Sequence, residues 1–307
     1  MASDSEKLKQ LDEISHFFLS SQEKPKGNAK VNPRQKKVDT AEFLDFFELS
    51  ENPFSDSINL KYFLNTEQHS HVFQKLKLSV EQNISLGLLS GTSGTGKTLI
   101  TQLLLTSLNP DKYQTILVLV TPGMTKTALV QDILLELGHG EKVKESNNVF
   151  NLLRALHEEV IALYQKGKRL VILIDEAHFL DSGSLHSLRT ISNIEVPEMK
   201  LTTCLLFAED FFMRRLQHES YASIRNRMYV KEHLEPLNLF QLKKYIQFRL
   251  SQAGAKTIPF KDETYQVIHT ATGGIPREVN NFVFNAMLEA YLQKEKVITN
   301  QILLKLL

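Results

Sequence analysis

The sequence predicts an α/β fold in which a parallel sheet, covered by helices on both faces, is followed by a small all-α domain. Between residues 66 and 230, short apolar runs alternate with segments of helical periodicity. Apolar strands separated by helices are typical of a parallel sheet that is buried on both faces. After Pro236 apolar residues recur only at helical spacing. A glycine-rich loop also stands between the first apolar run and the next helix, as in phosphate-binding folds.

Shifts in composition divide the chain into three parts. Residues 1–40 are expected to form a flexible basic arm, because residues 24–38 carry six Lys or Arg and no acid. The arm is either a solvated linker or a docking segment for nucleic acid, anionic lipid or an acidic partner. Residues 41–235 are expected to form the α/β nucleotide-binding core. Residues 236–307 are expected to form a helical lid domain.

The individual elements follow from periodicity. The aromatic segment 43–54 is expected to lie against the folded body. Helices are expected at 66–83, 97–108, 125–137, 147–165 and 185–194 in the core, and at 239–252, 262–271, 276–293 and 299–306 in the lid. Strands are expected at 86–90, 115–120, 170–174 and 201–207, with a short edge strand at 228–230.

Composition excludes several classes of protein. The net charge of +1 provides no general attraction for nucleic acid or anionic lipid, so such attraction must be local. The single cysteine, Cys204, rules out an intramolecular disulfide and lies in an apolar run, as a buried structural thiol does. No apolar signal core begins the chain, and no apolar run is long enough for a transmembrane segment. The expected location is the cytoplasm.

An eight-residue loop follows the first apolar run and opens the next helix. It consists of Gly91, Thr92, Ser93, Gly94, Thr95, Gly96, Lys97 and Thr98. Its glycines let successive backbone N–H groups turn toward one point, and the helix start adds unpaired N–H groups and a positive dipole end. Lys97 is expected to reach the β- and γ-phosphates, and the Thr98 hydroxyl to ligate Mg²⁺. The loop predicts binding of a nucleoside triphosphate.

Two carboxylates follow the apolar strand at 170–174. Ligands sit at the carboxyl ends of parallel strands, so Asp175 is expected to hold the Mg²⁺ shell. Glu176 is expected to orient or deprotonate the water that attacks the γ-phosphate. The guanine-reading Asn-Lys-x-Asp sequence is absent, which favours ATP over GTP. The expected cofactors are ATP and Mg²⁺.

The chain resembles the AAA+ ATPases, and within them the general secretion pathway protein A group, which is related to pilus-biogenesis ATPases and to transposition ATPases such as the Mu-phage B protein. The matching segments lie in order between residue 52 and residue 280. They are residues 52–54, the glycine-rich loop, 174–180, 188–193, 225–227, 234–237, 245–250 and 273–280.

The resemblance implies roles for three arginines. Arg277, at the start of a lid helix, is similar to the sensor arginine that reaches from the lid to the γ-phosphate. Arg225 and Arg227 stand where such proteins keep an arginine finger for the nucleotide of a neighbouring subunit. Either could be the finger, and a solvated pair is the alternative. The resemblance therefore implies a homo-oligomer.

One position departs from the family pattern. After the fourth strand, secretion ATPases usually place a polar amide as the first sensor, whereas this chain has Glu209, which cannot donate a hydrogen bond when ionised. Glu209 works through water, Thr202 or Thr203 takes over its part, or hydrolysis is slow.

Three functions remain open. The first is an ATP-hydrolysing AAA+ switch or motor, cytoplasmic or peripheral at the inner membrane through a partner, that remodels or positions a secretion, pilus or other envelope assembly. The second is a DNA-binding ATPase of a transposition system, favoured by the basic run at 24–38. The third is a nucleotide-gated scaffold with little hydrolysis, which the acidic residue at position 209 favours and the intact Glu176 opposes.

Overall fold

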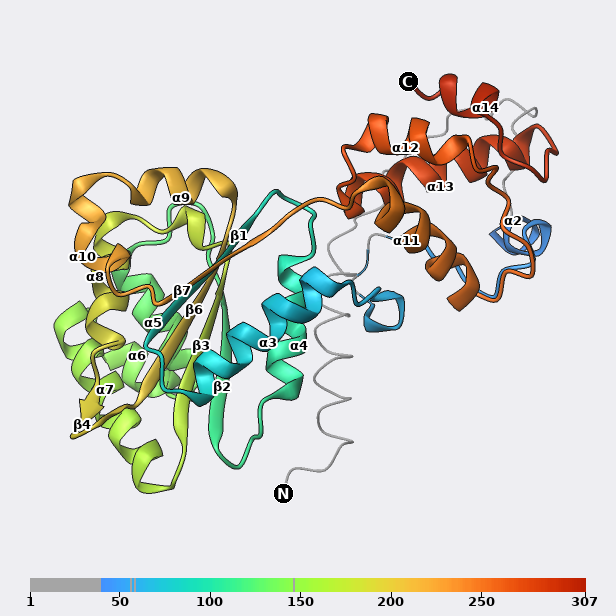
Figure 1. The fold of residues 1–307 in the computed structure, drawn as a ribbon. Helices are drawn as coiled ribbons and strands as arrows, with labels where there is room; N and C mark the ends of the chain where they lie inside the picture. The colour runs from blue at the N-terminus through green and yellow to red at the C-terminus, as the bar shows by residue number, and fades with distance from the viewer. Residues whose placement is uncertain (1–39, 56, 58, 146) are drawn as a thin grey trace, which may run out of the picture. The chain divides into compact units, whose positions relative to one another are not determined.

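The computed structural model describes residues 40–307 apart from positions 56, 58 and 146, and Thr40–Leu307 form one compact unit (Figure 1). The expected arm, with its basic run at 24–38, lies outside the described residues except for Thr40. Across the described part of the chain, no helix combines the length and the apolar character needed to cross a membrane.

A five-stranded sheet organises the described residues from 86 to 234. Its strands are all parallel and lie in the order β2-β3-β6-β1-β7. They are β1 Leu86–Gly91, β2 Tyr113–Leu119, β3 Arg169–Asp175, β6 Thr202–Ala208 and β7 Val230–Leu234. The central strands β1 and β6 are buried along their whole length, as strands covered on both faces must be. The parallel α/β fold predicted from the sequence is confirmed.

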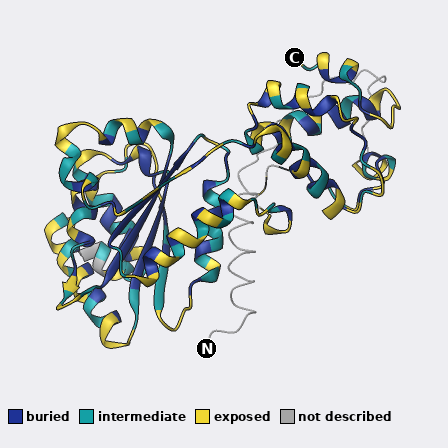
Figure 2. Cartoon of the chain, viewed as in Figure 1, coloured by how far each residue is buried: buried dark blue, intermediate teal, exposed yellow. Residues whose placement is uncertain are grey.

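Helices cover both faces of this sheet (Figures 1 and 2). One face packs against α3 Glu67–Glu81 and α4 Lys97–Ser107. The other face packs against α5 Lys126–Glu136, α7 Val149–Gln165, α8 Ser182–Ile191, α9 Asp210–Leu216 and α10 Ala222–Arg225, with α6 Gly140–Glu145 beside α5. Side chains alternate along β6, so Leu205 and Phe207 face α3 and α4 while Cys204 and Leu206 face the opposite side. Burial raises the pKa of the Cys204 thiol to about 12, as expected of a structural cysteine.

The described residues after Leu234 form helices, without a further named strand. They are α11 Leu239–Gln252, α12 Thr264–Thr272, α13 Pro276–Leu292 and α14 Asn300–Leu304. Their buried cluster also takes in the segment before the sheet, which contains α2 Thr40–Phe46 and the single-turn helix η1 Leu60–Tyr62.

Because of that shared cluster, the segment before the sheet packs with the C-terminal helices. The expected core at 41–235 placed residues 41–62 with the sheet, but their apolar side chains pack with the C-terminal helices instead. The ring of Phe43 meets the rings of Phe284 and Tyr291 edge-on, at centroid distances of 5.9 and 5.8 Å. The segment finds its aromatic partners there, and such edge-to-face pairs add to the gain from burial. The expectation that residues 43–54 lie against the folded body is confirmed.

Some element boundaries differ from the prediction. The edge strand expected at 228–230 is β7 Val230–Leu234, because its exposed side chains are polar and hide the strand in the sequence. The helix expected at 185–194 begins at Ser182, since the Asp181 side chain caps it by accepting from the Ser184 N–H at 2.6 Å. A short hairpin of β4 Glu195–Val196 and β5 Met199–Lys200 was not predicted.

The parallel topology brings all five strand ends to one edge of the sheet, and four of them concern the site. β1 ends at Gly91, β3 at Asp175, β6 at Ala208 and β7 at Leu234. These strands are hydrogen-bonded neighbours, so the residues that follow them lie close together. The carboxyl edge of such a sheet is the usual position of a ligand site.

Candidate nucleotide-binding site

The glycine-rich loop connects β1 to α4 at this edge. Gly94 and Gly96 have φ angles of 81° and 109°, in the left-handed region that glycine adopts without strain. The Thr95 hydroxyl donates to the Thr92 carbonyl at 2.8 Å, which closes the loop on itself. Gly96 caps α4 without a side-chain hydrogen bond, so the N–H groups of the first turn are left for a ligand.

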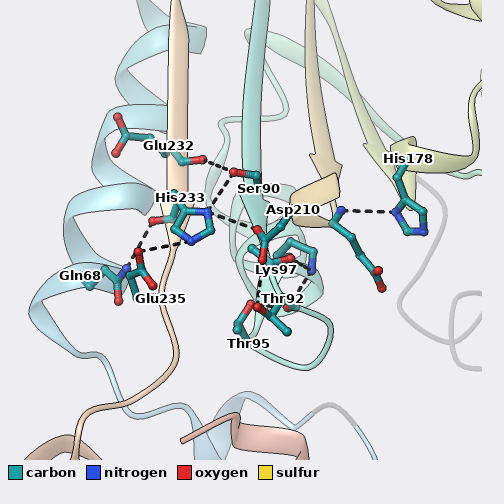
Figure 3. A network of polar contacts seen from close by, with 12 residues as sticks. Gln68, Ser90, Thr92, Thr95, Lys97, His178, Asp210, Glu232, His233 and Glu235 are labelled. Atoms are coloured by element: carbon teal, nitrogen blue, oxygen red, sulfur yellow. Dashed lines mark hydrogen bonds and ion pairs between the residues drawn. The ribbon is translucent and has the colours of Figure 1, made fainter. Parts of the chain in front are cut away.

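Lys97 is the first residue of α4 and is buried beneath the loop. Its Nζ donates to the carbonyls of Gly91 and Thr92, at 2.8 and 3.0 Å (Figure 3). Burial lowers the pKa of Lys97, and nearby carboxylates oppose that shift. In order of effect these belong to Glu209, Glu176, Asp175 and Asp210. The ammonium is thus a desolvated cation surrounded by acids, an arrangement that suits a polyphosphate bridged by a metal ion.

The two carboxylates after β3 have different surroundings. Asp175 is buried, and its Oδ1 accepts the backbone N–H of Glu176 at 2.9 Å. Glu176 has a φ angle of 56°, unusual for a residue with a side chain. Its carboxylate is 39% exposed and lines the same cavity as the glycine-rich loop. The structure therefore brings a buried carboxylate and an accessible one to the loop.

The donor set at this edge suits a hard cation. Thr98 lines the cavity with a hydroxyl, and Asp175 supplies a carboxylate close enough to act on Lys97. Magnesium in phosphate sites prefers such oxygen ligands and few of them from the protein, with the rest from phosphate and water. The residues present therefore fit Mg²⁺ bound together with a nucleotide.

Arg277 brings the start of α13 to the same loop. Its backbone N–H donates to the Gly94 carbonyl at 3.3 Å, and its Nη1 lies 3.5 Å from the Ser93 hydroxyl. A Cβ on Gly94 would stand 2.7 Å from the Cβ of Arg277. The start of α13 therefore rests on the loop at a point where only a glycine leaves room.

The far side of the cavity consists of residues to which the sequence analysis gave no role. Tyr62, Tyr245, Arg249 and Asn280 line it together with the loop. The guanidinium of Arg249 is buried, donates to the Pro53 carbonyl and to Tyr245 Oη, and lies 5.0 Å from the centroid of the Tyr62 ring. Burial raises the pKa of Tyr62 to about 12, and the Glu51 carboxylate adds to that shift. Tyr245, Arg249 and Asn280 belong to the family segments at 245–250 and 273–280, whereas Tyr62 lies outside every matching segment.

A second network connects the loop to the last strand (Figure 3). The Thr92 hydroxyl donates to Asp210 Oδ2 at 2.9 Å, and Asp210 Oδ1 lies 3.4 Å from His233 Nδ1. His233 Nε2 in turn lies 3.4 Å from Glu235 Oε1, in the connection between β7 and α11. Asp210 and His233 were missed because neither belongs to a motif, and only the alignment of strand ends brings them to the loop.

Arg225 and Arg227 lie away from the cavity. Arg225 Nη1 donates to the carbonyls of Leu216 and Gln217, at 2.7 and 2.8 Å, near the end of α9. Arg227 Nη1 donates to Asn193 Oδ1. Among the described residues, those that line the nucleotide cavity include neither Arg225 nor Arg227.

Of the three alternatives for the first sensor, the one that uses Thr202 or Thr203 does not fit the structure. Both residues lie at the amino end of β6, and the loop lies at its carboxyl end. At about 3.3 Å per residue, the length of the strand separates them from the loop by roughly 15–20 Å. Glu209, which directly follows β6, lies beside Lys97 instead.

Comparison with known proteins agrees with this geometry. Residues 80–216 match the family model described as an AAA domain. Over 250 residues the chain is 32% identical to General secretion pathway protein A of Aeromonas hydrophila, a match that covers 81% of this chain and 45% of that protein. The chain thus spans less than half the length of this relative.

Solved structures show the same fold. The ORC2 protein of Aeropyrum pernix, in ADPNP-ADP complexes, has a TM-score of 0.64 at 14% identity, covering 83% of this chain and 71% of that one. Cdc6p from Pyrobaculum aerophilum has a TM-score of 0.60 at 16% identity, covering 80% and 67%. At these identities the likeness concerns the fold alone.

The parallel sheet and the glycine-rich loop at its carboxyl edge define a nucleotide-binding protein of the P-loop class. More particularly, the chain belongs to the AAA family and is similar to General secretion pathway protein A, as the resemblance in its sequence implied.

Proposed function

We propose that this protein is an ATP-binding and ATP-hydrolysing AAA+ switch or motor. The observation that carries the proposal is the buried ammonium of Lys97 among the carboxylates of four acidic residues, directly below a loop with free helix N–H groups. A scaffold that only binds nucleotide has no use for the accessible carboxylate of Glu176 in that cluster. Membership of the AAA family supports the same chemistry.

Each residue of the site has a role in this proposal. Lys97 binds the β- and γ-phosphates, while Thr98 and Asp175 hold Mg²⁺, which when bound neutralises charge on the phosphates. Glu176 orients the attacking water and takes its proton. Arg277, which contacts the loop through Ser93 and Gly94, senses the γ-phosphate and transmits its loss to the helical domain.

Phosphate release by the wild type and by Glu176→Gln, measured at concentrations that permit assembly, tests the hydrolytic part. Glu176→Gln removes the base and keeps the shape, so it should lower the rate by about 10²-fold or more, the range for a positioned base, and retain nucleotide binding. Exposed Glu158 on α7 offers the matched control Glu158→Gln, which should hydrolyse ATP like the wild type. Equal rates for Glu176→Gln and wild type would eliminate the hydrolase assignment.

We further propose that the protein oligomerises through its nucleotide sites and divides into an α/β core ending near residue 235 and a helical lid after it. Arg225 or Arg227 supplies the finger in trans, once assembly releases it from its carbonyl or amide partner. Arg225→Ala and Arg227→Ala, each mixed with Glu176→Gln, identify the finger. The finger variant, whose active site is intact, should regain activity beside a Glu176→Gln neighbour that supplies its arginine.

The proposed target is a secretion, pilus or other envelope assembly. The name of the Aeromonas relative supports this choice, and the location that follows is the cytoplasm, with recruitment to the inner membrane through a protein partner. Glu176→Gln held with ATP should retain that partner in a pull-down, while Lys97→Ala should release it.

A second candidate target is DNA, favoured by the six basic residues between positions 24 and 38. Binding through them should weaken steeply as salt rises, because counterions are released from the DNA backbone. Absence of DNA binding even at low salt would exclude a transposition ATPase.

A further inference from the structure

His178 stands between the ends of two neighbouring strands. It belongs to the single-turn helix η2 Ala177–Phe179, which follows β3, while Glu209 follows β6. His178 Nδ1 lies 3.4 Å from the Glu176 Oε2, and also accepts the Glu209 backbone N–H at 3.4 Å. A ring nitrogen donates when it carries a proton and accepts when it does not, so Nδ1 serves the Glu176 carboxylate in one tautomer and the Glu209 N–H in the other.

The imidazole is held more firmly than the carboxylate it touches. The His178 side chain is 3% exposed, whereas that of Glu176 is 39% exposed. The rings of Phe179 and Phe211 pack against the imidazole, at centroid distances of 4.1 and 5.1 Å. A buried ring with two aromatic contacts has little rotational freedom, so it can restrict the rotamers of an accessible neighbour.

Helix α9 holds the backbone of the same turn. Arg215 Nη1 donates to the His178 carbonyl at 3.0 Å, and Nη2 donates to the Leu180 carbonyl at 2.6 Å. Phe211 and Arg215 both belong to α9, which begins directly after Glu209. A movement of α9 or of the end of β6 therefore reaches the imidazole through Phe211 and the Glu209 N–H, and reaches its backbone through Arg215.

We propose that His178 is the positioning residue for Glu176, through an Nδ1 proton directed at the Glu176 carboxylate. In the other tautomer Nδ1 accepts the Glu209 backbone N–H, which keeps the ring at the end of β6. The end of β6 and the carboxylate that activates water therefore compete for the same ring nitrogen. This inference rests on the proposed ATP hydrolysis and adds a residue to it.

Two substitutions separate positioning from packing. His178→Leu keeps a side chain of similar size beside the aromatic rings but removes Nδ1, whereas His178→Asn places an amide group near the position of Nδ1. We expect His178→Leu to lower kcat by about 10–100-fold, the cost of misplacing a reacting group by about 1 Å, with KM for ATP changed less than about threefold. His178→Asn should recover kcat to within about threefold of the wild type, and thermal unfolding of each variant verifies its fold.

Combination with Glu176→Gln shows whether His178 acts through the carboxylate. If it does, His178→Leu should lower the single-turnover rate of Glu176→Gln by less than about twofold, since residues that act as a unit are not additive. His186→Leu, at an exposed histidine on α8, is the control and should leave kcat unchanged.

The outcomes distinguish this inference from the proposed function. If Glu176→Gln abolishes hydrolysis while folded His178→Leu retains the kcat of the wild type, the role of His178 is refuted and the ATPase stands. Equal loss in His178→Asn and His178→Leu also refutes it, because Nδ1 would not be the group that matters. Unchanged hydrolysis in Glu176→Gln would refute both proposals.

Discussion

The two sides of the nucleotide cavity differ in the elements that supply their residues. The phosphate side consists of the glycine-rich loop with Lys97, which connects β1 to α4, and of Glu176, one residue beyond β3. The helical side consists of Tyr62, Tyr245, Arg249, Arg277 and Asn280, which come from η1, α11 and α13. Two short segments at the carboxyl edge of one parallel sheet build the first side, whereas the packing of separate helices assembles the second.

Each side of the cavity contains one buried cation, Lys97 on the phosphate side and Arg249 on the helical side, and the two have different partners. Lys97 is surrounded by carboxylates, and its ammonium donates hydrogen bonds to loop carbonyls. A bound phosphate can take the place of those carbonyls as the acceptor. Arg249 donates to Pro53 and Tyr245 and lies over the rings of Phe54, Tyr62 and Tyr245, contacts that hold the helical side itself together. We therefore expect substitutions on the phosphate side to affect ligand binding first, and those at Arg249 to affect stability first.

Lys97→Ala should produce the largest effect and abolish nucleotide binding. It removes at least two charge-assisted hydrogen bonds to phosphate, each worth about 1.5–3 kcal/mol, so affinity should fall by about 100-fold or more. Titration calorimetry with ATP and Mg²⁺ measures the loss, and Lys166→Ala, at an exposed helix end, is the control. Micromolar ATP affinity in Lys97→Ala would contradict the assignment of the loop.

Arg249→Ala should instead lower the free energy of unfolding by about 2–4 kcal/mol. The change empties a buried site and leaves the Pro53 carbonyl and Tyr245 hydroxyl without their donor. Arg154→Ala is the matched control, because Arg154 is exposed and forms a surface pair with Glu158 worth about 0.5 kcal/mol or less. Urea unfolding at fixed pH compares the two, and equal losses would remove the distinction between the two sides of the cavity.

Gly94→Ala tests the contact between the two sides. Gly94 and Gly123 have nearly equal φ angles, 81° and 83°, so an added Cβ strains both backbones alike. At Gly94 that Cβ meets Arg277 at 2.7 Å, while at Gly123 it meets nothing within 4 Å. Nucleotide affinity should therefore fall about tenfold in Gly94→Ala, roughly 1.4 kcal/mol, and stay near the wild type in Gly123→Ala. An equal loss in both variants would mean that backbone strain, and not the contact with α13, sets the effect.

The phosphate side was largely predictable because its chemistry is local in sequence. The loop at 91–98 needs glycines at fixed spacing, and the apolar run at 170–174 predicts a buried strand that ends beside Asp175. Once the sheet was predicted to be parallel, the meeting of these ends followed. What stayed hidden were Asp210 and His233, which reach the loop only because β6 and β7 both lie beside β1.

The helical side could not be derived from periodicity. The apolar pattern predicted α11 and α13 correctly but did not indicate that Arg249 is buried, since a lone arginine in a helix is usually exposed. Nor did it show that Phe43 and Tyr62 pack with these helices rather than with the sheet. Those contacts join residues about 200 positions apart, for which no local pattern exists.

The smallest expected effect concerns His69, which does not contribute a charge to the phosphate side but supports the glycine-rich loop from behind. His69 of α3 is buried behind the loop, with its Nδ1 2.7 Å from the Thr66 hydroxyl and its Nε2 3.3 Å from where a Cβ on Gly96 would stand. Burial lowers the pKa of His69 below its ordinary value of 6.5. As pH falls through that value, the unfolded chain takes up a proton that the folded one resists, so His69 makes the protein less stable in acid.

His69→Gln should therefore reduce the loss of stability between pH 7.5 and pH 5 by about 1 kcal/mol, within the limit of about 1.4 kcal/mol per pH unit for one group. Urea unfolding at the two pH values measures the difference, and His186→Gln, at an exposed histidine on α8, should keep the dependence of the wild type. If His69→Gln also kept it, the acid sensitivity would reside elsewhere. His69 would then support the loop through its packing alone.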